Sequence, residues 1–446
     1  MPTAAAGSEA TKYPADHIAW YTLGILVIAY TFSYVDRTIL TLLVGPIRTS
    51  LQISDTQISL LHGFAFAIFY TFLGIPIGRL ADRHHRVRII VVGVLLWSAM
   101  TALCGMARNF TQMFLARVGV GVGEAALSPS AYSILTDNYP PSRLPLAMSI
   151  YTASLYVGSG IAVIVGGALI SMVPALDLPV VGHVEPWQAV FFIFSAPGIV
   201  VAALMATVPE PARRGLLKEG GAAVMMPVRV VLQYLRERKG AYFLMMGGCA
   251  CLSLSYNGVT AWIPTYFIRV HEWTPRMAGV NYGLVVAIFG ATGIITGGKI
   301  AMMMKARGHR AANVKAGIIS GGLMLPTGII APLLDNAYLS LAVYAGFIFG
   351  ASYPWGAAAA ALQELTPNQM RGTVTAIHLL CLNIAGIGIG PTVVATFTDR
   401  VFGNDADVYL SNAVVPAIMV PIGIFLLWRA LDPFTRAVAA AGFKNT

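Results

Sequence analysis

Residues 78–88 read GRLADRHHRVR, a short basic stretch that contains one acidic residue, Asp82. Apolar stretches at about 56–80 and 87–107 flank it, and each is long enough to cross a bilayer as a helix of about 20 residues. Basic loops between spanning helices are found mainly on the cytoplasmic side of a membrane. We therefore expect residues 78–88 to join two membrane-spanning helices at the cytoplasmic face.

The composition extends this expectation to the whole chain. Of its 446 residues, 57% are hydrophobic and only 11% are charged, whereas a soluble domain carries about 25% charged residues. We expect an all-α membrane protein with twelve transmembrane helices. The predicted spans lie at about 18–43, 56–80, 87–107, 110–136, 144–172, 187–208, 240–268, 277–304, 314–333, 337–362, 372–398 and 408–431.

The Lys and Arg residues predict the orientation of the chain. Most of the 29 lie in loops that are cytoplasmic if the N-terminus is inside, and this asymmetry satisfies the positive-inside rule. We expect an integral membrane protein with both termini in the cytoplasm. The net charge of +10 then reflects topology and contact with membrane lipids, so nucleic acid is not an expected partner. The basic residues that fall outside are Arg48, Arg108, Arg269, Arg276 and Arg400.

The spans divide into two halves that resemble each other. Residues 139–143 join the fourth and fifth spans, residues 366–371 join the tenth and eleventh, and both loops contain Pro and Arg. Such internal symmetry is typical of transporters built from repeated bundles. The predicted parts are a cytoplasmic tail at 1–17, a six-helix bundle at 18–208, a cytoplasmic linker with an amphipathic helix at 209–239, a second six-helix bundle at 240–431 and a cytoplasmic tail at 432–446.

The stretch 78–88 resembles the G-x-L-A-D-R-x-G-R-R/K signature of the major facilitator superfamily, although His85 replaces its second Gly and Val87 interrupts its basic pair. The resemblance implies the major facilitator fold and a latch that closes the cytoplasmic side. The alternative is that Asp82 and its basic neighbours only fix the topology. The candidate residues of this cytoplasmic gate are Gly78, Asp82, Arg83, Arg86, Arg143 and Arg371.

Four ionisable residues lie inside predicted spans, Asp36 and Arg37 in the first and Arg117 and Glu124 in the fourth. A charge at bilayer depth costs roughly 2.5–3.5 kcal/mol, so such residues face a partner or a wet cavity. Counting residues places Asp36 and Arg117 at one level, about 10 Å inside the outer boundary, with Glu124 about 10 Å deeper. We expect Asp36 and Arg117 to form an ion pair that is either part of a proton-coupling mechanism or a static bridge.

The sequences Tyr34-Val35-Asp36-Arg37 and 117–125 resemble the Spinster branch of the superfamily, which exports lysophospholipids and sphingosine-1-phosphate. The resemblance implies that Asp36 and Glu124 take up protons and that Arg37 and Arg117 lie near an anionic headgroup. The proton would be the only coupling ion, and neither a cofactor nor a metal is expected.

A lipid cargo requires an apolar lining, because exposing a 16-carbon chain to water costs about 13 kcal/mol at roughly 0.8 kcal/mol per CH₂. Residues of the second half offer such a lining, although residues of this kind also occupy helix cores. The candidates are Tyr256, Asn257, Trp262, Tyr353, His378 and Asn383.

These patterns predict a monomeric, proton-coupled secondary active transporter that works by alternating access on a small amphipathic substrate such as a lysophospholipid or sphingolipid. A multidrug or organic-anion/proton antiporter is the alternative within transport. A non-transporting receptor or scaffold is the alternative from another class. An enzyme is not expected, because the sequence has no nucleotide-binding loop, metal-ligand cluster or nucleophile–base arrangement.

Overall fold

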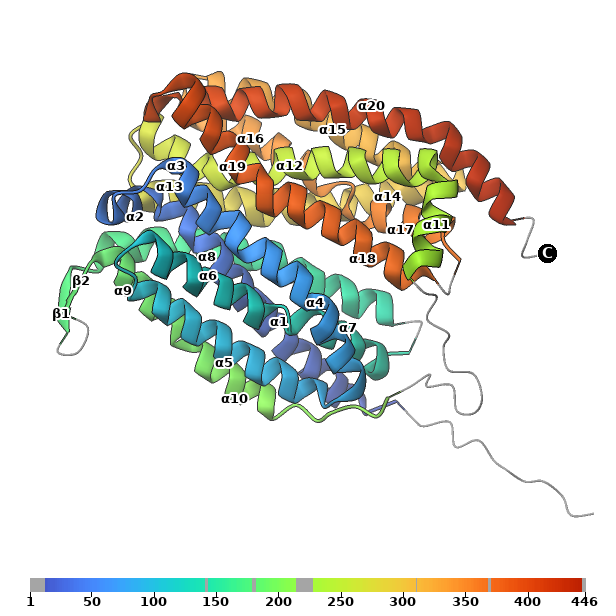
Figure 1. Cartoon of the computed structure of the whole chain (residues 1–446), viewed down its shortest axis with the longest axis horizontal. Helices are drawn as coiled ribbons and strands as arrows, with labels where there is room; N and C mark the ends of the chain where they lie inside the picture. The colour runs from blue at the N-terminus through green and yellow to red at the C-terminus, as the bar shows by residue number, and fades with distance from the viewer. Residues whose placement is uncertain are drawn as a thin grey trace, which may run out of the picture.

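The computed structural model describes residues 13–140, 143–178, 182–213, 228–309, 311–367 and 370–442. In these ranges the chain is almost entirely helical, apart from one two-stranded antiparallel hairpin. Figure 1 shows two helical bundles side by side, with the first half of the chain in blue to green and the second half in green to red. The strand hairpin lies at one end of the molecule, here called the hairpin end, and the C-terminal end of helix α20 lies at the other, here called the linker end.

The first bundle contains the helices and strands up to residue 206. Its elements are α1 (Asp16–Thr38), η1 (Ile39–Leu42), α2 (Val44–Leu51), α3 (Asp55–Ser59), η2 (Leu60–Phe64), α4 (Ala65–Arg83), α5 (Arg86–Gly105), α6 (Phe110–Glu124), α7 (Leu127–Asn138), α8 (Leu144–Met172), β1 (Leu176–Leu178), β2 (Gly182–Val184), α9 (Pro186–Ser195) and α10 (Pro197–Ala206).

The second bundle follows a short surface helix, α11 (Val228–Glu237). Its elements are α12 (Lys239–Val270), α13 (Pro275–Val285), η3 (Val286–Gly290), α14 (Ala291–Ala306), α15 (Ala312–Ile330), η4 (Ala331–Leu333), α16 (Ala337–Ser352), α17 (Trp355–Leu365), α18 (Arg371–Leu382), η6 (Asn383–Ile389), α19 (Gly390–Thr396), η7 (Phe397–Phe402), η8 (Asp405–Asp407) and α20 (Val408–Gly442). The segments η2, η3, η6 and η7 are π-helical, which widens the turn and changes the direction of the side chains that follow.

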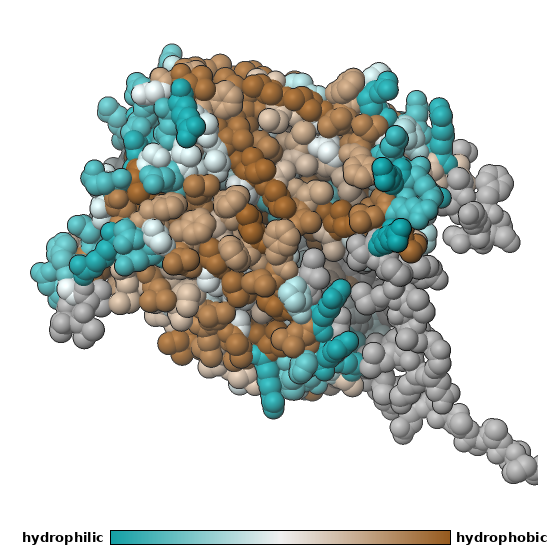
Figure 2. Space-filling view, in the orientation of Figure 1, coloured by the Kyte–Doolittle hydropathy of each residue, from teal (hydrophilic) through white to brown (hydrophobic). Residues whose placement is uncertain are grey.

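The helices form a membrane-spanning protein. Nine helical units among the described residues are long and apolar enough to cross a bilayer, and the other three predicted spans correspond to α6–α7, α12 and α16–α17. Figure 2 shows, on the face in view, a broad hydrophobic surface over the middle of the molecule and hydrophilic residues at both ends. Large apolar side chains of the spanning helices, such as Val92, Ile199 and Trp428, are more than half exposed, as expected for contact with lipid. The prediction of an all-α membrane protein is confirmed.

The two bundles are joined most tightly at the hairpin end. Arg269 of α12 donates two hydrogen bonds to the buried carboxylate of Asp55 in α3, at 2.5 and 2.8 Å. Asp399 of the second bundle accepts hydrogen bonds from the amide and the hydroxyl of Thr56, both at 2.7 Å, and Arg48 pairs with Asp405. The hydrogen bonds that join the bundles, in the part of the chain that the structure describes, lie at this end or near the middle of the molecule. The hairpin end is therefore closed.

Glycines make this closure possible. A Cβ atom added to Gly63 of η2 would lie 1.9 Å from the carbonyl oxygen of Ile387 in η6, and one added to Gly279 of α13 would lie 2.3 Å from that of Val163 in α8. Both contacts cross from one bundle to the other. Small residues allow membrane helices to approach this closely, so a larger side chain at either position would push the bundles apart.

At the linker end, α11 crosses the ends of α12 and α18 (Figure 1). Two of its own side chains, Val231 and Leu235, are buried against the bundle. The Tyr234 hydroxyl donates to the Leu365 carbonyl oxygen at 3.0 Å. Leu232 lies one residue after Val231 and three before Leu235, so helical spacing places it beside them, but it is 51% exposed. The buried stripe of α11 is therefore narrower than its pattern of apolar residues predicts.

Candidate functional site

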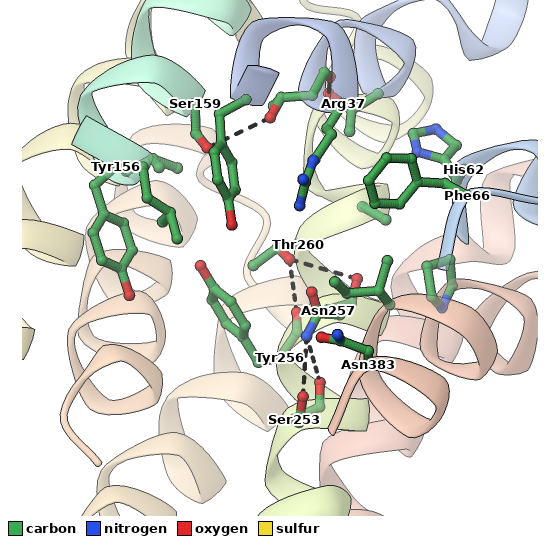
Figure 3. Close-up of a pocket in the computed structure, with 18 of the residues that line it drawn as sticks. Arg37, His62, Phe66, Tyr156, Ser159, Ser253, Tyr256, Asn257, Thr260 and Asn383 are labelled. Atoms are coloured by element: carbon green, nitrogen blue, oxygen red, sulfur yellow. Dashed lines mark hydrogen bonds between the residues drawn. The ribbon is translucent and has the colours of Figure 1, made fainter. Parts of the chain in front are cut away.

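A cavity of about 220 Å³ lies between the two bundles, near the middle of the molecule. Figure 3 shows polar side chains that line it from both sides, with Arg37 of α1 and His62 of η2 facing Asn257 and Thr260 of α12. Asn383 of η6 completes the polar wall of the second bundle, and its amide nitrogen lies 3.4 Å from the hydroxyl oxygen of Thr71 in α4. The lining also contains aromatic and aliphatic side chains, so the cavity is amphipathic.

Arg37, a charged residue in the wall of this cavity, forms an ion pair with Glu124. The Nε atom of Arg37 donates to Oε2 of Glu124 at 2.5 Å, and the Ser33 hydroxyl donates to the same oxygen at 2.6 Å. Glu124 is 1% exposed, whereas the Arg37 side chain remains 13% exposed on the cavity side. The other carboxylate oxygen, Oε1, has no hydrogen-bond partner in the described structure. The arginine therefore faces the cavity and the carboxylate lies behind it.

Three aromatic rings surround the same guanidinium group. Its central carbon lies 4.8 Å from the ring centre of Tyr34, 4.3 Å from that of Phe66 and 4.7 Å from that of Tyr70. Tyr34 precedes Arg37 by one helical turn of α1, and Phe66 and Tyr70 are one turn apart on α4. A cation held against ring faces in this way is stabilised by about 0.5–2 kcal/mol for each contact.

The predicted ion pair between Asp36 and Arg117 is wrong. Arg117 is fully buried and donates to two main-chain oxygens, those of Asp36 at 3.1 Å and Leu61 at 3.3 Å. The Asp36 carboxylate accepts a hydrogen bond from Thr101 of α5 at 3.2 Å. Neighbouring residues on a helix diverge by about 100°, so Asp36 faces the interior of the first bundle while Arg37 faces the cavity.

The predicted gate residues are spread over the linker end. Gly78 and Arg83 lie on α4, and the side chain of Asp82 lies outside the described part of the structure. Arg143 pairs with Asp16 at 3.0 Å, and Arg371 donates to the Thr366 carbonyl oxygen at 3.0 Å. Each of these two arginines therefore has a partner within its own bundle.

Arg86 is the centre of a separate buried cluster at the linker end. It is 1% exposed, pairs with Asp137 at the end of α7 and binds Glu210 after α10 at 2.7 Å. Burial alone raises the pKa of Glu210, but hydrogen bonds from the Val87 amide and from Arg86, together with the Arg86 charge, outweigh it and lower the pKa below its usual value. The sequence reasoning missed Asp137 and Glu210, although both are acidic residues beside predicted span ends.

Five of the six predicted lining residues of the second bundle fall into two groups, and the sixth, His378, lines a separate pocket. Tyr256, Asn257 and Asn383 line the cavity. Trp262 is instead packed in the core, where its ring nitrogen donates to the Pro391 carbonyl oxygen at 3.0 Å, and Tyr353 is 2% exposed among small residues of neighbouring helices. Aromatic residues in spans are ambiguous, because core packing and cavity lining require the same residue types.

A smaller apolar pocket of about 80 Å³, here called the annex, adjoins the cavity. Ser253, Tyr256 and Leu382 line both spaces. His378 of α18 lines the annex and is 3% exposed, and its Nδ1 atom has no hydrogen-bond partner in the described structure. The remaining wall is mostly aliphatic, so the annex favours apolar groups.

Known proteins resemble this chain over most of its length. The model of the Major Facilitator Superfamily matches residues 26–391. An "MFS-type efflux pump" of Mycolicibacterium smegmatis is 27% identical over 440 residues, which cover 98% of each chain. "Protein spinster" of Drosophila melanogaster is 23% identical over 397 residues, covering 86% of this chain and 62% of that protein.

A solved structure agrees with these sequence matches. The crystal structure of a bacterial homolog of the human lysosomal transporter Spinster, in an inward-facing and unoccupied conformation, is 27% identical to this chain. The match has a TM-score of 0.77 and covers 96% of this chain and 98% of that one.

Proposed function

The chain belongs to the major facilitator superfamily of membrane transporters, and we propose that it is a proton-coupled secondary active transporter for an anionic, single-chain amphipathic lipid. The predictions of this fold and of Spinster-like relatives are confirmed. Proteins of this family are in general transporters and not enzymes. In our proposal the protein works as a monomer, its hairpin end faces the outside of a bacterial inner membrane, and both termini lie in the cytoplasm.

The observation that carries the proposal is the ion pair between Glu124 and Arg37, because Arg37 lines the cavity between the bundles. When Glu124 is ionised, it neutralises Arg37. When Glu124 takes up a proton, Arg37 loses its partner and becomes available to an anionic headgroup. Because each ligand then changes the affinity for the other, proton binding and substrate binding are thermodynamically linked.

The shape of the site supports an amphipathic substrate. Arg37 and the amides of Asn257 and Asn383 offer polar contacts to a headgroup, and the annex offers an apolar surface nearby. At about 80 Å³ the annex holds only part of a long acyl chain. The rest of the chain must reach the bilayer or the cytoplasmic side, because water contact costs roughly 0.8 kcal/mol per CH₂.

We assign different roles to the other embedded charges. Glu124 is the main proton carrier, because its pairing with Arg37 connects it to the cavity. Asp36 is a second proton site inside the first bundle, where Arg117 lies close to it. Arg117 acts through its contacts with the main chain of α1 and does not bind the headgroup directly.

Alternating access follows from the contacts at the hairpin end. The closed hairpin end corresponds to the state in which the cavity is accessible from the cytoplasm, and the similarity to an inward-facing relative supports this assignment. Opening to the outside requires the bonds of Asp55, Asp399 and Asp405 across the bundles to break.

The similarity to an efflux pump favours a second candidate, a multidrug or organic-anion/proton antiporter. Both candidates use the same Arg37–Glu124 pair, so the substrate decides between them. A hydrophobic cation would be the characteristic substrate of a multidrug antiporter, and an aromatic carboxylate that of an organic-anion antiporter.

Proteoliposomes that contain a pH-sensitive dye test the proposal. Oleoyl lysophosphatidylglycerol is expected to produce proton flux through the unmodified protein, and Glu124→Gln is expected to abolish it. The matched control is Glu237→Gln on α11, which changes an exposed carboxylate far from the cavity and leaves the flux unchanged. Flux with tetraphenylphosphonium or benzoate but not with the lysolipid would support an antiporter instead. Absence of flux with every amphiphile would support a receptor or scaffold.

A further inference from the structure

Arg37 has two kinds of partner, a carboxylate that can take up a proton and a set of aromatic rings. Glu124 neutralises it through Nε, whereas the rings of Tyr34, Phe66 and Tyr70 contact the guanidinium group at 4.3–4.8 Å. Removing the counter-ion of a buried charge costs several kcal/mol unless other contacts stabilise it. The proposed coupling therefore needs something that keeps Arg37 in place after Glu124 has taken up a proton.

We propose that Tyr34, Phe66 and Tyr70 form an aromatic cage that positions Arg37 for a planar oxyanion when Glu124 is protonated. This inference rests on the proposed function. The rings remain available to the cation whether or not the carboxylate is charged, because their attraction comes from the electron density of the ring faces. The cage thus replaces part of the stabilisation that Glu124 withdraws.

The hydrogen bonds of Arg37 explain why an oxyanion is the expected ligand. Among the described residues, only its Nε atom has a hydrogen-bond partner. Figure 3 shows the guanidinium end of Arg37 pointing into the cavity beside Phe66. Its two terminal nitrogens form a planar fork that binds two oxygens of a phosphate or carboxylate at once. A cage that fixes the plane of this fork selects such groups over neutral headgroups.

The cage is itself held by neighbouring helices. Phe66 and Tyr70 stack with ring centres 5.2 Å apart, and the Tyr70 hydroxyl lies 3.3 Å from that of Ser128 on α7. Tyr34 packs edge-on against Tyr30 at 5.1 Å. Helices α1, α4 and α7 therefore fix the rings, and the position of Arg37 does not depend on Glu124 alone.

The pH response of this site depends on the groups around Arg37. The second bundle contributes neutral polar residues from α12, α13 and η6 to the cavity wall, and no charged side chain among its described lining residues. Tyr256 of α12 is the titratable residue of the second bundle that interacts with Tyr34 of the cage, among the residues that the structure describes. The titratable and charged groups of the first bundle around the cage are Asp36, Arg117, Glu124, His62, Tyr30, Tyr34, Tyr70, Tyr132, Tyr151 and Tyr156.

Binding of oleoyl lysophosphatidylglycerol, which keeps one negative charge between pH 5 and 8, measures the effect of the cage. The unmodified protein is expected to bind this lipid more tightly at pH 5 than at pH 8. Phe66→Leu is expected to weaken binding about tenfold at pH 5 and much less at pH 8, because one cation–π contact is lost only where Glu124 no longer holds Arg37. Phe66→Tyr, which keeps the ring, should behave like the unmodified protein.

Three controls separate positioning from general packing. Monoolein has a neutral headgroup and an oleoyl chain, so its binding should not change in Phe66→Leu. Phe191→Leu removes a buried ring elsewhere in the first bundle. It should leave the ratio of the lysolipid affinity at pH 5 to that at pH 8 unchanged. If Phe66→Leu does not fold, Tyr70→Leu takes its place in the test and should show the effect expected of Phe66→Leu. An equal loss for both lipids at both pH values would overturn the proposal.

A measurement without lipid distinguishes this inference from the proposed function. In the Glu124→Gln background the cage is the main support of Arg37, so Phe66→Leu should lower the thermal unfolding temperature more there than in the unmodified protein. Additive effects of the two substitutions would overturn the cage. Coupled effects without any pH-dependent lysolipid binding would retain the cage and overturn the proposed substrate.

Discussion

Replacing Asp55 by asparagine is expected to open the hairpin end of the protein. The Asp55 carboxylate is fully buried and accepts two hydrogen bonds from Arg269 across the bundles. Arg48 of the same bundle lies 3.5 Å from it. Asparagine keeps one oxygen acceptor and the backbone position, and the capping box formed by Ser54 and Gln57 remains intact. The substitution therefore removes the charge and one strong bond without breaking α3.

The expected size of this effect follows from burial. Removing one partner of a fully buried ion pair costs about 3–5 kcal/mol. The side chains of Arg269 and Arg48 are 15% and 27% exposed, so solvent reduces this cost. We take about 2 kcal/mol, which shifts the ratio of open to closed hairpin ends by roughly 30-fold at 1.36 kcal/mol per tenfold change.

Spin labels at Thr49 and Tyr338, which are exposed near the hairpin end of the first and second bundle, measure this opening in a background without the four native cysteines. In Asp55→Asn the population at longer distance should grow. Asp177→Asn is the matched control, because it neutralises an exposed carboxylate at the same end that pairs within the first bundle with His183. Unchanged distance distributions in Asp55→Asn would refute the assignment of this contact as a gate.

Four further outcomes are expected. Glu124→Gln and acidification should shift the spin-label distances in the same direction, and identical distributions at pH 5 and 8 would contradict the coupling. Gly279→Leu should keep the bundles apart at the hairpin end and raise the accessibility of that end to a thiol reagent at a nearby cysteine. Because the folded-state pKa of Glu210 is lowered, its bonds to Arg86 stabilise the protein above the usual pKa of about 4 and are lost as the pH falls through the folded-state pKa. Thermal unfolding should show this loss, by about 1 kcal/mol at most, and Glu210→Gln should remove it. Leu252→Trp should fill the annex and weaken binding of long-chain lysolipids more than that of short-chain ones, as direct binding measurements would show.

The sequence alone predicted the spans and the family, because a bilayer imposes the length of a spanning helix and the stretch 78–88 is distinctive. It predicted that charged residues lie inside the spans but not which partners they contact. Counting residues gives the depth of Asp36 and Arg117 but not the direction in which each side chain points. The π-helical turns add to this difficulty, since η2 and η6 change the facing of Phe66 and Asn383 relative to a regular helix.

Other parts of the site were beyond sequence reasoning for similar reasons. The cage requires rings from α1 and α4 to meet one guanidinium group, and no sequence spacing connects Tyr34 with Phe66. Trp262 and Tyr353 have the residue types of a cavity lining but are buried in helix contacts. Glu210 follows the last span of the first bundle, where its bond to Arg86 depends on how that helix packs.

Among the described residues, the ion pairs of the linker end connect residues of the same half of the chain, as Asp16 with Arg143 and Lys305 with Glu364 illustrate. A rotation of one half relative to the other would leave these ion pairs intact, whereas it would break the ion pairs of the hairpin end. Evolution can therefore adjust the rigidity of each half and the balance between its two orientations through separate sets of residues. Substitutions that raise the thermal stability of the protein need not slow its transport cycle.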